Sequence, residues 1–285
     1  MEDGEIVDFK NWLINNGKSK NTIDSYSLHI AGFQKWFKNS FGREQNILYR
    51  ENILDYISYL LNIKHLNGKS VNAKLSALLK FNEYLITKNV QSDYVISKND
   101  YIKIQAEYLN PVTITKIEVD SFRQIILENR SKRDYALITL LIYSGLRVSE
   151  ALNIRINDMD LVSKEILVRY GKGKKQRIIV INDKIVNAIK EYFKERENSP
   201  HSSSEYLFIS RESDCLNRTS VNRIFNLYGN KITPHKLRHF FCSYALESGW
   251  STHEVALQAG HSNIHTTMTY THPSITAIKN KANML

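Results

Sequence analysis

Hydrophobic residues in the first hundred positions recur at steps of three and four. Between residues 21 and 37 they are Ile23, Tyr26, Ile30, Phe33 and Phe37, and the same spacing returns over residues 51–63 and 69–86. This period places apolar side chains on one face of an α-helix. The alternation of a half-buried strand does not occur before about residue 100. The pattern predicts a bundle of about four helices, stabilised by the packing of these faces.

The rest of the chain has a mixed pattern. Residues 88–113 lose the helical period and contain an Asn-Pro pair, which is typical of a linker. Thr115 followed by Glu118 marks a helix start with a capping box, and Gly145 is placed to end the helix over residues 133–144. Two β-branched runs, 164–170 and 176–182, flank the sequence GKGKK and predict a β-hairpin. Helical patterns then resume to the end of the chain.

The expected fold is therefore mainly α, with a small antiparallel β-sheet in the second domain. We expect a helical domain over residues 1–90, a linker over residues 91–110 and a second domain over residues 111–285. A chain of 285 residues with 42% hydrophobic residues is long enough and apolar enough for two cores.

The charge of the chain narrows the range of partners. Lys and Arg number 39 against 29 Asp and Glu, and eight of the ten excess positive charges fall after residue 110. Such a balance favours a polyanion, most often nucleic acid, although a basic protein without such a partner stays open. Two cysteines are too few for a disulfide framework, and the acidic start does not resemble a signal peptide. The longest apolar run, about 12 residues, is too short to cross a bilayer. We expect a cytoplasmic protein without a membrane partner.

The stretch ITPHKLRHFF holds two histidines and an arginine close together. His235 and His239 have the spacing of a metal-binding pair, but a lysine stands where the metalloprotease motif has glutamate. Thr233 suits an N-cap and Pro234 the first helical position, so His235 falls in a first turn, where free N–H groups favour an anion. With Arg238 on the same face, the stretch predicts a phosphate site and no metal. A basic surface turn with His239 packed inside is the alternative.

Three further clusters carry candidate chemistry. Arg147 and Glu150 are three residues apart, so the carboxylate can orient a guanidinium that pairs with phosphate oxygens, or the two form an ordinary helical ion pair. Lys172 lies between two glycines at the hairpin tip, where it can donate a proton or simply be exposed. His261 follows a helix-ending glycine, and Tyr270 comes nine residues later. A tyrosine nucleophile needs cationic partners, because a free phenol has a pKa near ~10.

The order of these residues resembles the tyrosine recombinase (phage integrase) family, which includes the Xer recombinases. The stretches SGLRVSE, HKLRHFF and GHSNIHTTMTYTH each resemble a family signature. The resemblance covers the whole second domain, and the first domain is similar to the family's core-binding, SAM-like domain. It implies a two-domain, C-shaped clamp. One departure is Ala259, where the family usually has leucine, and we expect it to affect packing rather than chemistry. The ordered set is Arg147, Lys172, His235, Arg238, His261 and Tyr270.

The resemblance implies how protons and bonds move. Tyr270 would attack a DNA phosphodiester, forming a 3′-phosphotyrosine and freeing a 5′-hydroxyl. His235 would help to deprotonate the tyrosine, and Lys172 would protonate the leaving 5′-oxygen.

The resemblance also implies which residues hold the phosphate. Arg147 and Arg238 would bind its non-bridging oxygens and stabilise the charge of the transition state. His261 would donate a hydrogen bond to it, and Glu150 would support these residues. The phosphodiester energy stays in the covalent link, so the resemblance implies neither a cofactor nor a metal.

The implied partners are double-stranded DNA recombination sites and three further copies of the chain. Family members work as a homotetramer in the synaptic complex and pass through a Holliday junction; the need for accessory DNA sites or proteins stays open. The tail after Pro273 would dock on a neighbouring copy through Ile275, Ile278 and Leu285. The helical domain starts almost at Met1, which favours a Xer-like or resolvase-like enzyme of a bacterial mobile element, such as a cointegrate resolvase. A type IB topoisomerase-like enzyme and a non-catalytic DNA-binding protein of the same fold are the alternatives.

Overall fold

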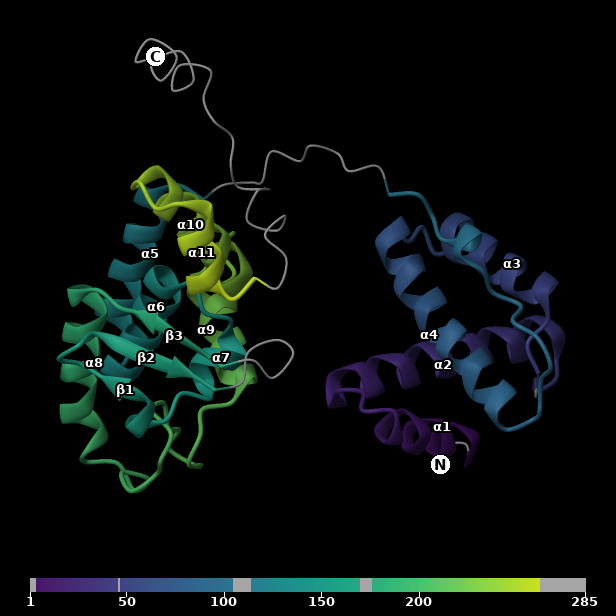
Figure 1. Ribbon diagram of the computed structural model, residues 1–285, viewed down its shortest axis with the longest axis horizontal. Coiled ribbons are helices and arrows are strands. Elements are labelled where there is room, and N and C mark those ends of the chain that lie inside the picture. Colours follow the sequence, from purple (N-terminus) through teal and green to yellow (C-terminus); the bar gives the residue numbers. More distant parts are fainter. Residues whose placement is uncertain (1–3, 46, 105–113, 170–175, 262–285) are drawn as a thin grey trace, which may run out of the picture. The chain divides into compact units, whose positions relative to one another are not determined.

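The computed structural model describes residues 4–45, 47–104, 114–169 and 176–261. The chain divides into two compact units, Met1–Leu109 and Asn110–Leu285. Figure 1 labels the helices and strands of both units.

The first unit is a bundle of helices around one apolar core. Phe9, Ile30, Phe33 and Leu78 are almost fully buried in this core. The side chain of Ser19 caps the second helix and that of Asn67 caps the fourth, each by accepting a backbone N–H. The predicted helical bundle is therefore confirmed. Its helices are α1 (Gly4–Asn15), α2 (Lys20–Phe41), α3 (Arg50–Ser58) and α4 (Gly68–Thr87), with a π-helical turn (Tyr59–Ile63) after α3 and a 3-10 turn (Lys98–Asp100).

Residues 91–104, which belong to the expected linker of 91–110, pack on this helical unit. Ile96 is buried in the core of the unit. The side chain of Asn82 accepts the N–H of Val95 at 2.8 Å, and Asn72 accepts the N–H of Ile102 at 2.8 Å. Side-chain amides of α4 thus accept backbone N–H groups of this segment. Hydrophobic periodicity does not reveal such contacts.

The second unit combines helices with a three-stranded antiparallel sheet in the order β1-β2-β3. Its strands are β1 (Met159–Asp160), β2 (Glu165–Val168) and β3 (Arg177–Val180), and Val168 pairs with Arg177. The predicted hairpin is confirmed, while the short β1 was not predicted. The helices are α5 (Lys116–Asn129), α6 (Lys132–Ser144), α7 (Val148–Leu152), α8 (Asp183–Arg196), α9 (Arg218–Tyr228), α10 (Pro234–Glu247) and α11 (Thr252–Ala259), with a 3-10 turn (Ile156–Asp158).

The centre of the second unit is α6, which packs against α5, α8 and α10, while β3 runs beside α11 (Figure 1). Several predicted helix ends are confirmed. Thr115 and Glu118 form the capping box of α5, and Thr233 caps α10 with Pro234 in its first turn. Gly145 ends α6 with φ 69°. No helix in the described part of the chain is long and apolar enough to span a membrane.

Candidate active site

Helix ends carry the predicted polar residues that the structure describes in the second unit. Arg147 is the N-cap of α7, two residues after the glycine that ends α6. His235 and Arg238 lie in the first turns of α10. His261 follows Gly260, whose φ of 68° ends α11. At a helix end the backbone N–H or C=O groups have no partner within the helix, so residues at these positions can face a common ligand.

Glu150 is the buried acceptor of the site, with a side chain only 2% exposed. Its Oε1 accepts from Arg147 Nη1 at 2.8 Å, and its Oε2 accepts from the Arg147 backbone N–H at 2.9 Å. Arg177 donates to the same carboxylate, from Nη2 at 2.9 Å and from Nη1 at 3.2 Å. Burial by itself raises the pKa of Glu150, but the hydrogen bonds from Arg177 and from the Arg147 N–H, with both positive charges, lower it overall. Glu150 is therefore ionised and shared by two arginines.

Arg177 is a site residue that the sequence analysis missed. It opens β3, where burial alternates and Ile179, two residues on, is buried while Ile178 is exposed. The strand pattern therefore places Arg177 on the inward face. An arginine on that face requires a buried anionic or carbonyl partner. An arginine at an inward position of the predicted strand was therefore the feature of the sequence that could have identified Arg177.

Arg238 is buried in the site, 5% exposed. Its Nη1 donates to the carbonyl of Gly145, and its buried Nη2 has no hydrogen-bond partner among the described residues. Burial, followed by the charge of Arg147, lowers the pKa of Arg238 to about 10, so the side chain is still a cation at pH 7. A buried cationic N–H without an acceptor is costly, and an anion bound at this point would remove that cost.

The histidines of the site are neutral at pH 7. Nε2 of His235 and Nε2 of His239 lie 2.9 Å apart, and burial lowers the pKa of both, that of His239 to about 4. Burial and then the charges of Arg238 and Arg147 lower the pKa of His261 to about 4. His239 is thus paired with His235 and is not merely packed. The described residues hold no group of three or more His, Cys, Asp or Glu side chains that could bind a metal ion.

Gln258 holds the end of α11 on the strand that carries Arg177. Its amide oxygen accepts the N–H of Val180 at 3.1 Å, and its amide nitrogen donates to the carbonyl of Val180 at 2.8 Å. The same nitrogen donates to the carbonyl of Ser144 at 3.3 Å. The next residue, Ala259, is fully buried in a small cluster with Phe241.

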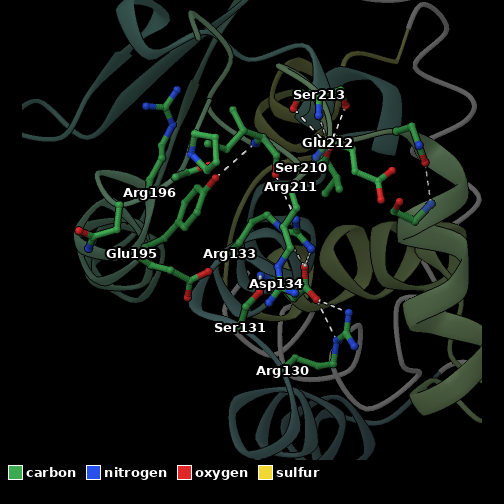
Figure 2. A pocket seen from close by; sticks show the side chains of 18 of the residues that line it. Arg130, Ser131, Arg133, Asp134, Glu195, Arg196, Ser210, Arg211, Glu212 and Ser213 are labelled. Atoms are coloured by element: carbon green, nitrogen blue, oxygen red, sulfur yellow. Dashed lines mark hydrogen bonds and ion pairs between the residues drawn. The ribbon is translucent and has the colours of Figure 1, made fainter. Parts of the chain in front are cut away.

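An open cavity of about 1160 Å³ lies elsewhere in the second unit, and none of the predicted site residues lines it. Figure 2 shows Asp134 in this cavity between Arg130 and Arg133, which donate to it at 2.8 and 2.9 Å. Arg196, also part of the lining, donates to the carbonyls of Ser202 and Ser204 among others. These charges are paired with groups of the protein itself, whereas Nη2 of Arg238 has no acceptor among the described residues.

The described part of the site has more positive than negative charge. Arg147, Arg177 and Arg238 surround one carboxylate, which leaves an excess of two positive charges beside neutral histidines. Such an arrangement can hold an anion and stabilise negative charge that develops on it. Lys172, Tyr270 and the tail after Pro273 lie outside the described residues.

The chain thus has a helical bundle and a mixed domain whose arginine-rich site can hold an anion. Comparison with known families places this combination. Residues 113–276 match the phage integrase family, and residues 6–89 match the N-terminal SAM-like domain of phage integrases. The chain therefore belongs to the phage integrase family, the tyrosine recombinases.

Individual relatives agree with this assignment. The chain is 51% identical to the TnP I resolvase of Bacillus thuringiensis over 97% of its own length and 98% of that relative. It is 35% identical to the tyrosine recombinase XerC of Psychromonas ingrahamii, over 74% of the chain and 72% of the relative. The expectation of a tyrosine site-specific recombinase is thereby confirmed.

A solved structure supports the expected architecture. The crystal structure of the XerH site-specific recombinase bound to a palindromic difH substrate superposes with a TM-score of 0.72. The match covers 91% of this chain and 78% of that one, at 24% identity. At this level of identity the likeness concerns the fold, which has the helical SAM-like domain followed by the mixed domain.

Proposed function

We propose that this recombinase cleaves and rejoins DNA through a 3′-phosphotyrosine formed by Tyr270. The observation that supports the proposal best is the buried guanidinium of Arg238, whose Nη2 has no acceptor among the described residues. It lies close enough to Arg147 for that charge to lower its pKa. With Glu150 shared between Arg147 and Arg177, the two cations keep an excess positive charge that favours a bound anion, and a phosphodiester in cleavage gains negative charge at its non-bridging oxygens.

In the proposed reaction, the tyrosine oxygen attacks phosphorus while the bond to the 5′-oxygen breaks. His235, whose pKa is lowered, is neutral at pH 7 and can accept the phenolic proton. Lys172 gives its proton to the leaving 5′-oxygen. Arg147 and Arg238 bind the non-bridging oxygens, the neutral His261 donates its ring N–H to the phosphate, and Glu150 holds Arg147.

The proposed partners follow from the family and from the relatives. We expect residues 1–90 to form the core-binding DNA-binding domain and residues 111–285 the catalytic domain. The enzyme would bind double-stranded recombination sites as a homotetramer and resolve a Holliday junction, with the tail after Pro273 docked on a neighbouring copy. Similarity to a resolvase over nearly the whole chain supports action on a mobile element, such as cointegrate resolution, in the cytoplasm of a bacterium.

The test is covalent capture of DNA. Labelled DNA from the region that flanks the gene is incubated with the protein and with Tyr270→Phe, in buffer with EDTA, and is then denatured. We expect a protein–DNA adduct from the wild-type chain only, with equal DNA binding by both in a gel-retardation assay. An adduct from the Phe variant would exclude Tyr270 as the nucleophile.

Two further readouts separate the alternatives. Binding without an adduct, even on a nicked substrate that traps cleaved strands, would indicate a non-catalytic DNA-binding protein. Relaxation of supercoiled DNA without any exchange between two labelled sites would indicate a type IB topoisomerase-like enzyme.

A further inference from the structure

Arg177 joins three parts of the second unit that are far apart in the sequence. Its side chain is 14% exposed and donates to both oxygens of Glu150. Its Nε also donates to the carbonyl of Gln258 at 3.1 Å, and its Nη2 to the carbonyl of Ala259 at 3.2 Å. All three guanidinium nitrogens thus have acceptors within the protein. Arg177 differs in this from Arg238, whose Nη2 has no acceptor in the described part of the chain.

The guanidinium of Arg177 also lies against the turn that precedes His261. A Cβ atom on Gly260 would lie 2.5 Å from both Cζ and Nη1 of Arg177, closer than real contacts allow. A side chain at this position would have to displace the guanidinium from its acceptors, and the φ of 68° at Gly260 favours glycine independently. The side chain of Arg177 therefore helps to hold the turn before His261 close to Glu150, together with Arg147, whose Nη2 donates to the carbonyl of Gly260 at 3.4 Å.

The third part is the hairpin. Arg177 is the first residue of β3 and pairs with Val168 at the end of β2. Lys172 lies between these two paired residues in the sequence. The ion pair of Arg177 with Glu150 therefore anchors the start of β3, at which the lysine-bearing segment ends.

We propose that Arg177 is a positioning residue for DNA cleavage. Through Glu150 it sets the guanidinium of Arg147, and through the carbonyls of Gln258 and Ala259 it sets His261. By sharing Glu150, it also leaves part of the charge of Arg147 uncompensated and available to a phosphate. This inference rests on the proposed function, because it concerns the same reaction.

The test compares Arg177→Met and Arg177→Lys with Arg169→Met. Arg169 is a matched control because it lies on the same hairpin and its Nε is 2.5 Å from Oδ1 of Asp158, a carboxylate 1% exposed. The rate of single-turnover cleavage is measured on a nicked substrate at saturating protein, together with DNA affinity and thermal midpoint.

We expect Arg177→Met to cleave about 100-fold more slowly than wild type, because misplacement of reacting groups by about 1 Å costs that much. Its DNA affinity should stay within about threefold of that of the wild type, since the N–H groups of Arg177 are hydrogen-bonded to acceptors of the protein. Arg177→Lys should recover only part of the rate, because one ammonium cannot reproduce a planar fork of donors. Arg169→Met should cleave within about threefold of wild type even where its thermal midpoint falls.

A further readout separates positioning from a general loss of structure. If Arg177 acts in part through Glu150, combining Arg177→Met with Glu150→Gln should slow cleavage by less than the product of the two single losses. A double variant slowed by the full product of the two single losses would overturn the proposed action of Arg177 through Glu150. A wild-type rate for Arg177→Met, or equal loss in Arg169→Met at equal thermal midpoint, would overturn the positioning role. Absence of an adduct from the wild-type chain would instead overturn the proposed function, and this inference with it.

Discussion

Replacing Glu150 with glutamine should destabilise the second unit and slow DNA cleavage. The substitution keeps the shape of the side chain but removes the charge that compensates Arg147 and Arg177. Four N–H groups donate to the two carboxylate oxygens at 2.8–3.2 Å. In glutamine one of these oxygens is replaced by an NH₂ group, which cannot accept a hydrogen bond from the N–H groups that face it. Two arginines are left near Arg238 without a counter-charge.

The expected loss of stability follows from the burial of Glu150. Removing one partner of a buried ion pair costs ~3–5 kcal/mol, and we take the lower end because the side chain of Arg147 is 32% exposed and can be hydrated. A loss of about 3 kcal/mol corresponds to a fall of about 6–12 °C in the thermal midpoint of a domain of this size. Cleavage should slow by about 100-fold, because the guanidinium of Arg147 loses its fixed orientation.

The assay combines thermal unfolding, followed by circular dichroism, with single-turnover cleavage. Asp158→Asn is the matched control, since Asp158 is also a buried carboxylate with an arginine partner but lies outside the site. We expect this control to lose thermal stability and to retain cleavage. A thermal midpoint of Glu150→Gln within 2 °C of wild type at ~pH 7 would refute the reasoning from burial.

The pH dependence of the same pair gives an internal check. The folded pKa of Glu150 lies below its ordinary value of 4.5, so its contribution is complete above that pH and is lost as the pH falls through the folded pKa. The difference in thermal midpoint between wild type and Glu150→Gln should therefore persist from neutral pH to about pH 5 and shrink on further acidification.

Two more predictions follow from the end of α11 and from the histidines. Gly260→Ala should slow cleavage and lower stability by more than Gly249→Ala in the same assays. Both glycines have positive φ (68° and 94°), but an added Cβ meets Arg177 only at Gly260. Equal losses in the two variants would mean that the contact with Arg177 has no effect. His239 and His261 have pKa values lowered to about 4, so between that pH and about 6.5 the unfolded chain binds more protons and stability falls as the pH falls. With allowance for partial solvent access the loss is about 1 kcal/mol for each, visible as a lower urea midpoint at pH 5 than at pH 7. His239→Gln should flatten this decline, and an unchanged slope would contradict the pKa assignment.

Local features of the sequence determined the helix ends and hence where the site residues fall. Thr115 with Glu118, Thr233 with Pro234, and Gly145 act on backbone groups within one turn of themselves, so short stretches of sequence suffice to predict them. The β-branched runs predicted the hairpin for the same reason, since strand alternation and turn residues are local properties.

Only the tertiary structure decided which of these residues meet. Glu150 and Arg177 are 27 residues apart, and Arg177 lies 81 residues from the carbonyl it holds in α11. No periodic pattern encodes such pairs, because the partners come together only after the elements that carry them, α7, β3 and α11, have packed in the folded domain. The same holds for residues 91–104, which lack a helical period yet are held on the first unit by Asn72 and Asn82. Hydrogen bonds between distant polar groups depend on the packed arrangement of whole elements, and that arrangement follows from the apolar cores rather than from the polar residues themselves.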